Sequence, residues 1–354
     1  MATKFYRRLA ISFGAAFLSG QVVAQTFDLE RHETETLETS ADMISWGGMG
    51  GVAVDREGYI WQSNFGEYLW RIHPKSGEVK EFADGFLSAS GNAALPGGDI
   101  LQAEFATGRI WKIDRFKAGE RTLFSDEGLS GPVGVAVLRD RGVFVANCFA
   151  GNIARIPLEG GAAEVFATHE LFNCPNGVTA DPDGNLYIVN NQDTYVFKIT
   201  PEGETTVFAH LPGVGHGHIA YAQGALYIAQ LWNHKIIRLE MNGDHKVVAG
   251  DGRPGLKDGH DKAASVTHPN GLASASGGSV LIHNNIDGPM MVGDRARLVI
   301  RKTYLPSLSR SIRKAFEAGG VRRMLAVYDQ HAGAPGAANQ VSSAATILLQ
   351  QGPP

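Results

Sequence analysis

The chain of 354 residues is poor in cysteine, in charge and in long apolar runs. Its two cysteines allow at most one intramolecular disulfide. Charged residues make up 19% of the chain and no basic cluster lies in its central part, which argues against nucleic acid as a partner. No stretch after residue 24 is apolar over a bilayer's width, so no membrane span is expected in the mature protein.

One short apolar run, at the N-terminus, has the features of a secretory signal peptide. Residues 1–24 begin with Lys4, Arg7 and Arg8, continue apolar through residues 9–18, and end in small residues. A membrane anchor is the alternative, but the run is short for a span, so cleavage and export to the periplasm or medium are expected. Cleavage would remove three positive charges and move the net charge from −4 to −7, that is 29 basic minus 36 acidic residues.

Glycine, in contrast, is abundant, with 44 residues, and six glycines open a repeated phrase. At Gly51 it reads GVAVDREGYIWQSN and at Gly177 it reads GVTADPDGNLYIVN: an apolar run, a polar turn and a second apolar run. The six anchor glycines are Gly51, Gly91, Gly134, Gly177, Gly217 and Gly271. A repeat of about 40 to 50 residues built from short strands predicts an all-β protein, a six-bladed β-propeller with one four-stranded blade per repeat.

The propeller is expected to occupy residues 25–305. The sixth repeat has a third strand near residues 297–300 but no clear fourth strand, so we expect residues 26–40 to supply it and close the ring. The long interval before the sixth repeat contains an insertion, residues 250–268, expected as a loop. Residues 306–331 have helical spacing and predict a short C-terminal helix, and residues 332–354 have the composition of a disordered tail.

Thirteen residues after each anchor glycine, a polar side chain ends the second strand of the repeat. These strand-end residues are Asn64, Glu104, Asn147, Asn190, Gln230 and Asn284. One blade per repeat would arrange them in a ring around the channel. Asn side chains at strand ends often cap turns, but oxygen donors gathered in one ring also suit a hard cation such as calcium or contacts to a substrate.

The residue before each anchor glycine is expected at the same mouth of the channel. These entrance residues are Gly50, Ser90, Val133, Asn176, His216 and Asn270. His216 there is a candidate general base for activating water, with a solvated loop histidine as the alternative. Glu104, the one acid in the strand-end set, is a candidate cation ligand or a catalytic acid or base with a raised pKa. His218 is expected to be structural.

Two further features belong to this mouth. Phe65, Phe105, Phe149 and Trp232 follow or neighbour the strand-end residues and predict an apolar wall for a small organic substrate, with packing between blades as the alternative. Cys148 ends a second strand and Cys174 precedes the next anchor glycine, so both are expected on one rim in adjacent blades. A disulfide between them is predicted, with two free thiols as the alternative.

The segments Pro175-Asn176-Gly177 and His268-Pro269-Asn270-Gly271 resemble the calcium-dependent six-bladed lactonases, the gluconolactonase and senescence-marker group, and more distantly the paraoxonase and arylesterase group. The resemblance implies that Asn176 and Asn270 bind calcium or another divalent cation, helped by Glu104, Asn147 or Asn190. The family also uses acidic ligands at blade entrances, where this chain has Gly50 and His216. GDGRPGLKDG followed by HPNGLA also resembles NHL repeats, which occur in binding scaffolds, and streptogramin lyases are propellers too.

From the residues and the resemblance together we expect an exported, monomeric, metal-assisted hydrolase of a lactone or small ester. Asn64, Gln230 and Asn284 would contact the substrate with Phe65, Phe149 and Trp232. The cation would polarise the substrate carbonyl, and His216 or Glu104 would handle the proton. Two alternatives stay open: a streptogramin-type lyase that uses His216 and a divalent ion, and a non-catalytic propeller that binds a ligand or a protein.

Overall fold

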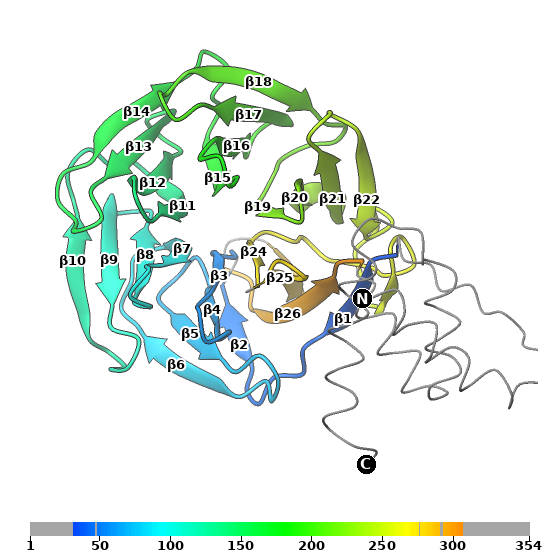
Figure 1. Cartoon of the computed structure of the whole chain (residues 1–354). Helices are drawn as coiled ribbons and strands as arrows, with labels where there is room; N and C mark the ends of the chain where they lie inside the picture. The colour runs from blue at the N-terminus through cyan, green and yellow to red at the C-terminus, as the bar shows by residue number, and fades with distance from the viewer. Residues whose placement is uncertain (1–30, 47, 276, 291–292, 307–354) are drawn as a thin grey trace, which may run out of the picture. The chain divides into compact units, whose positions relative to one another are not determined.

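A computed structural model describes residues 31–46, 48–275, 277–290 and 293–306, which form a six-bladed β-propeller (Figure 1). The predicted fold class is therefore confirmed. The predicted signal peptide, the helical extension (apart from Pro306) and the tail lie outside the described residues. Helical structure within the described ranges is limited to a short 3-10 turn, η2 (Leu231–Asn233), and none of it is long and apolar enough to span a membrane.

Blades 1 to 5 are antiparallel four-stranded sheets, each made of consecutive strands. Blade 1 consists of β3 (Val52–Val54), β4 (Ile60–Ser63), β5 (Leu69–Ile72) and β6 (Val79–Ala83). Blade 2 consists of β7 (Ala89–Ala94), β8 (Ile100–Glu104), β9 (Arg109–Ile113) and β10 (Arg121–Ser125). Blade 3 consists of β11 (Pro132–Leu138), β12 (Gly142–Asn147), β13 (Asn152–Ile156) and β14 (Glu164–Thr168).

The remaining blades continue the pattern and then break it. Blade 4 consists of β15 (Pro175–Ala180), β16 (Leu186–Asn190), β17 (Tyr195–Ile199) and β18 (Thr205–His210). Blade 5 consists of β19 (Ile219–Ala222), β20 (Ala225–Gln230), β21 (Lys235–Glu240) and β22 (His245–Ala249). Blade 6 has β24 (Leu272–Ser274), β25 (Val280–Asp287) and β26 (Ala296–Tyr304), joined by β1 (Glu33–Thr36), β2 (Met43–Ser45) and β23 (Gly259–His260).

The hydrophobic core lies between the blades. Every residue of the second strands β12 and β20 is buried, because both faces of each strand pack against a neighbouring blade. Phe144 of blade 3, for example, shares one cluster with Ile188 and Phe197 of blade 4. This arrangement explains why the second apolar run of each repeat is continuous rather than alternating.

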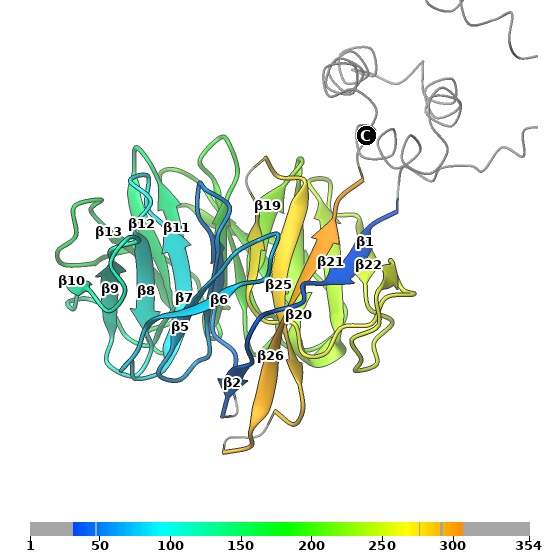
Figure 2. The same cartoon turned by 90° about the horizontal axis from the view of Figure 1, so that it is seen from below.

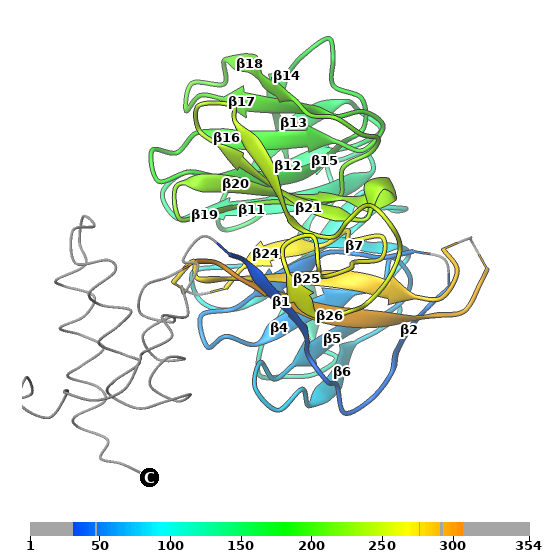
Figure 3. The same ribbon diagram turned by 90° about the vertical axis from the view of Figure 1, so that its right-hand side faces the viewer.

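The N-terminal segment closes the propeller, as the sequence predicted. β1 pairs antiparallel with β26, from Glu33 opposite Tyr304 to Thr36 opposite Arg301, and so becomes the fourth strand of blade 6 (Figure 3). Inside the sheet, the hydroxyls of Thr34 and Thr303 lie 2.9 Å apart and Thr303 also contacts Nε2 of His283 at 3.0 Å. Because these three polar side chains are buried, another register of β1 against β26 would leave them without hydrogen bonds.

The insertion at residues 250–268 is more than the loop that was expected, because it holds β1 from the other side. Its short strand β23 pairs with β1, with Gly259 opposite Thr34. Oδ1 of Asp258 accepts hydrogen bonds from the backbone and hydroxyl of Thr36, each at 2.9 Å, and pairs with the fully buried guanidinium of Arg301 at 2.9 Å. The closing strand is therefore hydrogen-bonded on both edges.

The anchor glycines meet around the channel, where each innermost strand touches the next. A Cβ at Gly91 would lie 2.0 Å from the carbonyl oxygen of Val133, and one at Gly134 would lie 2.2 Å from that of Asn176. At Gly217 the nearest such atom is the carbonyl oxygen of Asn270, at 2.6 Å, and at Gly271 it is the backbone nitrogen of Val52, at 2.8 Å. Real Cβ contacts are not this short, so the repeated glycine is a requirement of blade-to-blade contact.

Candidate functional site

The first strands begin and the second strands end at one end of the channel, which we call the upper mouth. The pairing of Pro132 with Asn147, of Pro175 with Asn190 and of Ala89 with Glu104 places both sets of predicted residues there. The long β25–β26 hairpin, with β2 against β26, projects beyond this face of the disc (Figure 2). The entrance and strand-end residues thus share one end of the propeller.

The strand-end residues are buried and bond to nearby backbone. Oδ1 of Asn64 accepts from the amides of Gly66 at 2.9 Å and Tyr68 at 3.1 Å, and Asn147 accepts from Ser130 at 3.2 Å. The other members behave alike: Asn190 donates to Leu171 and Asp193, Gln230 donates to Pro212, and Asn284 accepts from Gly271 and donates to Gly50. Each side chain links the end of a second strand to a neighbouring loop. This is the turn-capping role that the sequence left open as the alternative to binding a cation or a substrate.

Glu104 is held by three donors. Oε1 accepts from the amide of Leu87 at 2.8 Å, and Oε2 accepts from the Thr107 hydroxyl and from Nε1 of Trp111 at 3.1 Å. Burial would raise the pKa of Glu104, but the hydrogen bonds from Thr107, Leu87 and Trp111 together lower it below its ordinary value. The carboxylate is therefore ionised at neutral pH, in contrast to the raised pKa that a general acid requires.

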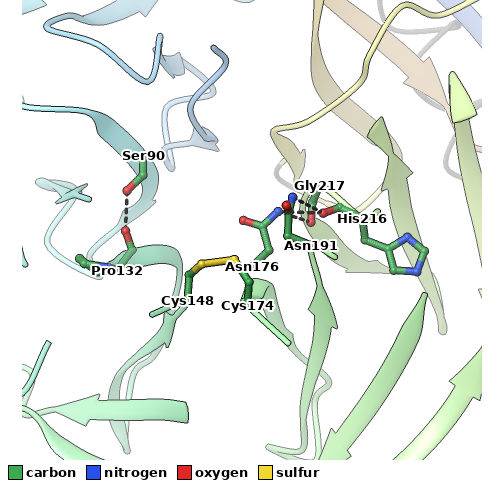
Figure 4. Close-up of a disulfide and its surroundings, with 8 residues drawn as sticks. All are labelled: Ser90, Pro132, Cys148, Cys174, Asn176, Asn191, His216 and Gly217. Carbon is green, nitrogen blue, oxygen red and sulfur yellow. Dashed lines mark hydrogen bonds between the residues drawn. A yellow bond between two sulfur atoms is a disulfide. The ribbon is translucent and has the colours of Figure 1, made fainter. Parts of the chain in front are cut away.

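Asn176 is the entrance residue whose geometry is most informative (Figure 4). Its Nδ2 donates to the carbonyls of His216 at 2.8 Å and Gly217 at 3.1 Å, which orients the amide. The oxygen consequently points away from His216, as the figure shows, and within the described part of the chain it makes no hydrogen bond. A fixed amide with an unused oxygen can serve as a ligand or as a hydrogen-bond acceptor.

Asn270 repeats this arrangement two blades further on. Its Nδ2 donates to the carbonyls of Met49 at 2.6 Å and Gly50 at 3.3 Å. Its Oδ1 lies against the backbone of Gly217, only 2.8 Å from where a Cβ would stand. Gly217, whose carbonyl accepts from Asn176, therefore lies between the two asparagines that the sequence selected.

His216 and His218, on either side of Gly217, are both buried. The imidazole of His216 is fully buried and points away from Asn176 (Figure 4), and burial lowers its pKa to about 4, opposed by the Thr194 backbone and the charge of Asp193. Burial lowers the pKa of His218 to about 4 as well. His218 was expected to be structural; its backbone hydrogen bond to the carbonyl of Asn270, at 2.8 Å, places it beside a candidate ligand and makes it a candidate too.

Three further histidines lie in blades 5 and 6 or in the segment between them. His234 accepts from the backbone amide of His268 at 3.1 Å, and their rings lie 4.4 Å apart beside Trp232. His283 is buried inside blade 6, opposite Leu272 of β24 and between the side chains of Asn285 and Thr303.

The predicted apolar wall is assembled in part. The rings of Phe65 and Phe105 have centroids 5.3 Å apart, and those of Phe105 and Phe149 are 4.7 Å apart, so the three residues form a continuous arc over blades 1 to 3. Trp232, in blade 5, contacts His268 instead. Cys148 and Cys174 form a disulfide that joins blades 3 and 4 beside the mouth (Figure 4), as predicted.

The described residues fit a divalent cation only through amide oxygens. Among them no group of three or more His, Cys, Asp and Glu side chains is placed to hold a metal ion. Glu104 and Asn147 already accept hydrogen bonds, whereas Asn176 and Asn270 have oxygens to spare. Calcium prefers several oxygen ligands that include carboxylates, so these two amides would hold an ion together with water or substrate.

The chain is similar to propellers of different activities. It is 24% identical over 220 residues to a virginiamycin B lyase from Nocardia farcinica, covering 59% of this chain and 73% of that protein. The structure of a gluconolactonase from Xanthomonas campestris matches 82% of this chain and 99% of its own with a TM-score of 0.59 at 15% identity. A virginiamycin B lyase from Staphylococcus aureus matches 77% and 99% with a TM-score of 0.53 at 16% identity. No family model matches.

These identities are low, so the structural likeness shows the fold alone. The chain is a six-bladed propeller whose structural neighbours include a gluconolactonase and virginiamycin B lyases. The narrower resemblance to the senescence-marker group stays a prediction.

Proposed function

We propose that this protein is an exported enzyme that cleaves a lactone or a small ester at the upper mouth of its channel. The observation that carries the proposal is the pair of amides, Asn176 and Asn270, on either side of Gly217. Each donates its hydrogens to the next blade and keeps its oxygen free. The similarity to a gluconolactonase structure supports a hydrolase.

A divalent cation, if bound, would be held by the oxygens of Asn176 and Asn270 and would polarise a substrate carbonyl. Because the hydrogen bonds to blades 5 and 1 fix both amides before substrate arrives, neither oxygen needs to reorganise. Proton transfer is assigned to His218, which is neutral at pH 7 and whose backbone amide donates to the carbonyl of Asn270 at 2.8 Å. His216 is given a positioning role, since its carbonyl accepts from both Asn176 and Asn191, the latter at 3.2 Å.

The test is turnover of a panel of lactones and small esters by the exported chain, with calcium and with a chelator. Asn176→Ala should lower kcat/KM by on the order of a hundredfold or more, as loss of a charge-stabilising group does, while Asn176→Asp should retain metal binding. Asn173→Ala is the matched control, because Asn173 is exposed on the same loop. Full activity in Asn176→Ala would refute the assignment.

The second candidate is a lyase, favoured by the 24% identity to a virginiamycin B lyase. Elimination breaks the carbon–oxygen bond of the ester after a base removes a neighbouring proton, so the product carries a new double bond. Hydrolysis instead adds water across the ester. Mass spectrometry of the product separates the two, because only hydrolysis raises the mass by one water.

A further inference from the structure

We infer that the arc formed by Phe65, Phe105 and Phe149 binds the flat apolar face of a ligand, so that the site takes an aromatic or similarly apolar lactone or ester rather than a sugar lactone. That the ligand is a lactone or ester rests on the proposed function. That the ligand has a flat apolar face rests on the arc alone. The arc contributes one ring from each of three consecutive blades.

The arc is positioned by backbone hydrogen bonds. The amide of Phe65 donates to the carbonyl of Ala89 at 3.0 Å, that of Phe105 to Ser88 at 3.0 Å, and that of Phe149 to Ser130 at 3.2 Å. Each phenylalanine is thereby tied to a loop that leads into a first strand. These bonds fix the backbone of each phenylalanine, and the ring contacts restrict the side chains, before any ligand arrives, which reduces the entropy cost of binding.

Glycines make room for the rings. A Cβ at Gly131 would lie 2.8 Å from Cδ2 of Phe149 and 3.1 Å from Cε2 of Phe105, and one at Gly48 would lie 3.0 Å from Cβ of Phe65. Gly131 also has a φ of +60°, which a side chain rarely adopts. The corresponding position three residues before the anchor is Ser88 in blade 2 and Cys174 in blade 4. Glycine is therefore required where Phe149 and Phe105 pack over residue 131, whereas blade 2 accommodates a serine beside Phe105.

The arc is packed on one side and open on the other. Phe105 is enclosed between its two neighbours, but Phe149 keeps 69% of its surface exposed, and Leu87, on the adjoining entrance loop, keeps 60%. Packing between blades, the alternative for these residues, accounts for the ring contacts but leaves the exposed faces of Phe149 and Leu87 without a partner among the described residues. Clusters of exposed apolar side chains in soluble proteins commonly mark binding sites.

The chemistry of the arc selects its ligand. Aromatic edges and faces attract another flat ring in offset or tilted geometry. A sugar lactone would place hydroxyl groups against hydrocarbon and lose their hydrogen bonds to water without replacement. An aromatic lactone would bury only carbon against the arc. Its carbonyl would remain free to reach a cation held by the oxygens of Asn176 and Asn270.

Equilibrium binding tests the inference apart from catalysis. The probes are dihydroquinolinone, the lactam analogue of an aromatic lactone, and gluconolactam, the analogue of a sugar lactone, neither of which an esterase turns over readily. Isothermal titration should show binding of the aromatic lactam, weakened about tenfold or more by Phe149→Ala and by Phe105→Ala, since an aromatic contact and its buried area together reach that size.

Phe116→Ala is the matched control. Phe116 is 76% exposed but lies between β9 and β10, at the other end of the propeller, so its removal should leave the dissociation constant unchanged. Equal binding by wild type and Phe149→Ala, tighter binding of gluconolactam, or no binding of the aromatic lactam would each overturn the inference. Binding of the aromatic lactam with no turnover of any ester would uphold it while refuting the proposed hydrolase.

Discussion

Asn176 of blade 4 donates its side-chain amide to the carbonyl of His216, 2.8 Å away at the entrance of blade 5. Alternate blades repeat this contact: Ser90 donates to Pro132 at 2.7 Å, and Asn270 to Met49 at 2.6 Å. The even blades therefore hold the odd blades around the channel. In Asn176 and Asn270 the Nδ2 group holds neighbouring blades together, and the Oδ1 atom is left for function. Substitution by aspartate removes the Nδ2 donor and keeps an oxygen, so it separates the two roles.

The first prediction concerns the anchor glycines. Gly134→Ala would place a methyl group 2.2 Å from the carbonyl oxygen of Asn176, and backbone on both sides would have to shift. We expect a loss of about 1–3 kcal/mol in the free energy of unfolding, as for other overpacked sites. Gly97→Ala is the control, because a Cβ there meets no atom within 4 Å. Chemical denaturation of both variants checks the difference, and equal stabilities would contradict it.

The second prediction concerns closure of blade 6. Asp258→Asn removes the carboxylate that pairs with the buried Arg301 and accepts from Thr36. Because Asp258 itself is half exposed, we expect a loss of about 2 kcal/mol, below the cost of breaking a fully buried pair. Amide hydrogen exchange in β1 should then be faster in the variant than in the wild type, whereas exchange in β5 should be the same in both. The exposed Asp126→Asn should change neither quantity, and unchanged exchange in β1 would argue against the clamp.

The third prediction concerns the disulfide between blades 3 and 4. Cys148 and Cys174 are separated by 26 residues, and a crosslink of that span stabilises by about 3 kcal/mol through the unfolded state. The double variant Cys148→Ser/Cys174→Ser should lose about that amount in urea denaturation, and a reducing agent should have no further effect on it. A wild-type midpoint that reductant leaves unmoved would count against this contribution.

The fourth prediction concerns acid. Burial lowers the pKa of His218 to about 4 and that of His283 to about 3, from an ordinary value of 6.5. Above pH 6.5 the two histidines are neutral in both the folded and the unfolded chain. Below pH 6.5 they take up protons in the unfolded chain but stay neutral in the folded chain. Stability should therefore fall as the pH decreases from about 6.5 towards 4, where each buried histidine costs on the order of 3 kcal/mol.

Thermal unfolding across that pH range provides the measurement. His283→Gln should flatten the slope of the melting temperature against pH, whatever its effect on stability at neutral pH. His245→Gln, at an exposed position, should leave the slope as it is. If wild type and His283→Gln show the same slope, His283 is not the source of the acid sensitivity.

Sequence periodicity was sufficient for the fold, because the repeat fixes both strand length and strand order. The closing strand predicted within residues 26–40 is β1, and the third strand predicted near residues 297–300 lies within β26. The disulfide also followed from register, since both cysteines were placed on one rim in adjacent blades. These features depend on local pattern and on the number of blades, both of which are visible in a linear sequence.

The direction of side chains was decided only by tertiary structure. A linear register places His216 and Asn176 at equivalent positions, yet one imidazole is buried and one amide oxygen is free. Likewise, Glu104 was identified as an acid among amides, but its lowered pKa depends on Thr107, Trp111 and the backbone of Leu87. Burial and hydrogen-bond partners come from residues brought together by the closed ring, and for that reason the chain's repeats predict where a site lies but not which atoms it presents.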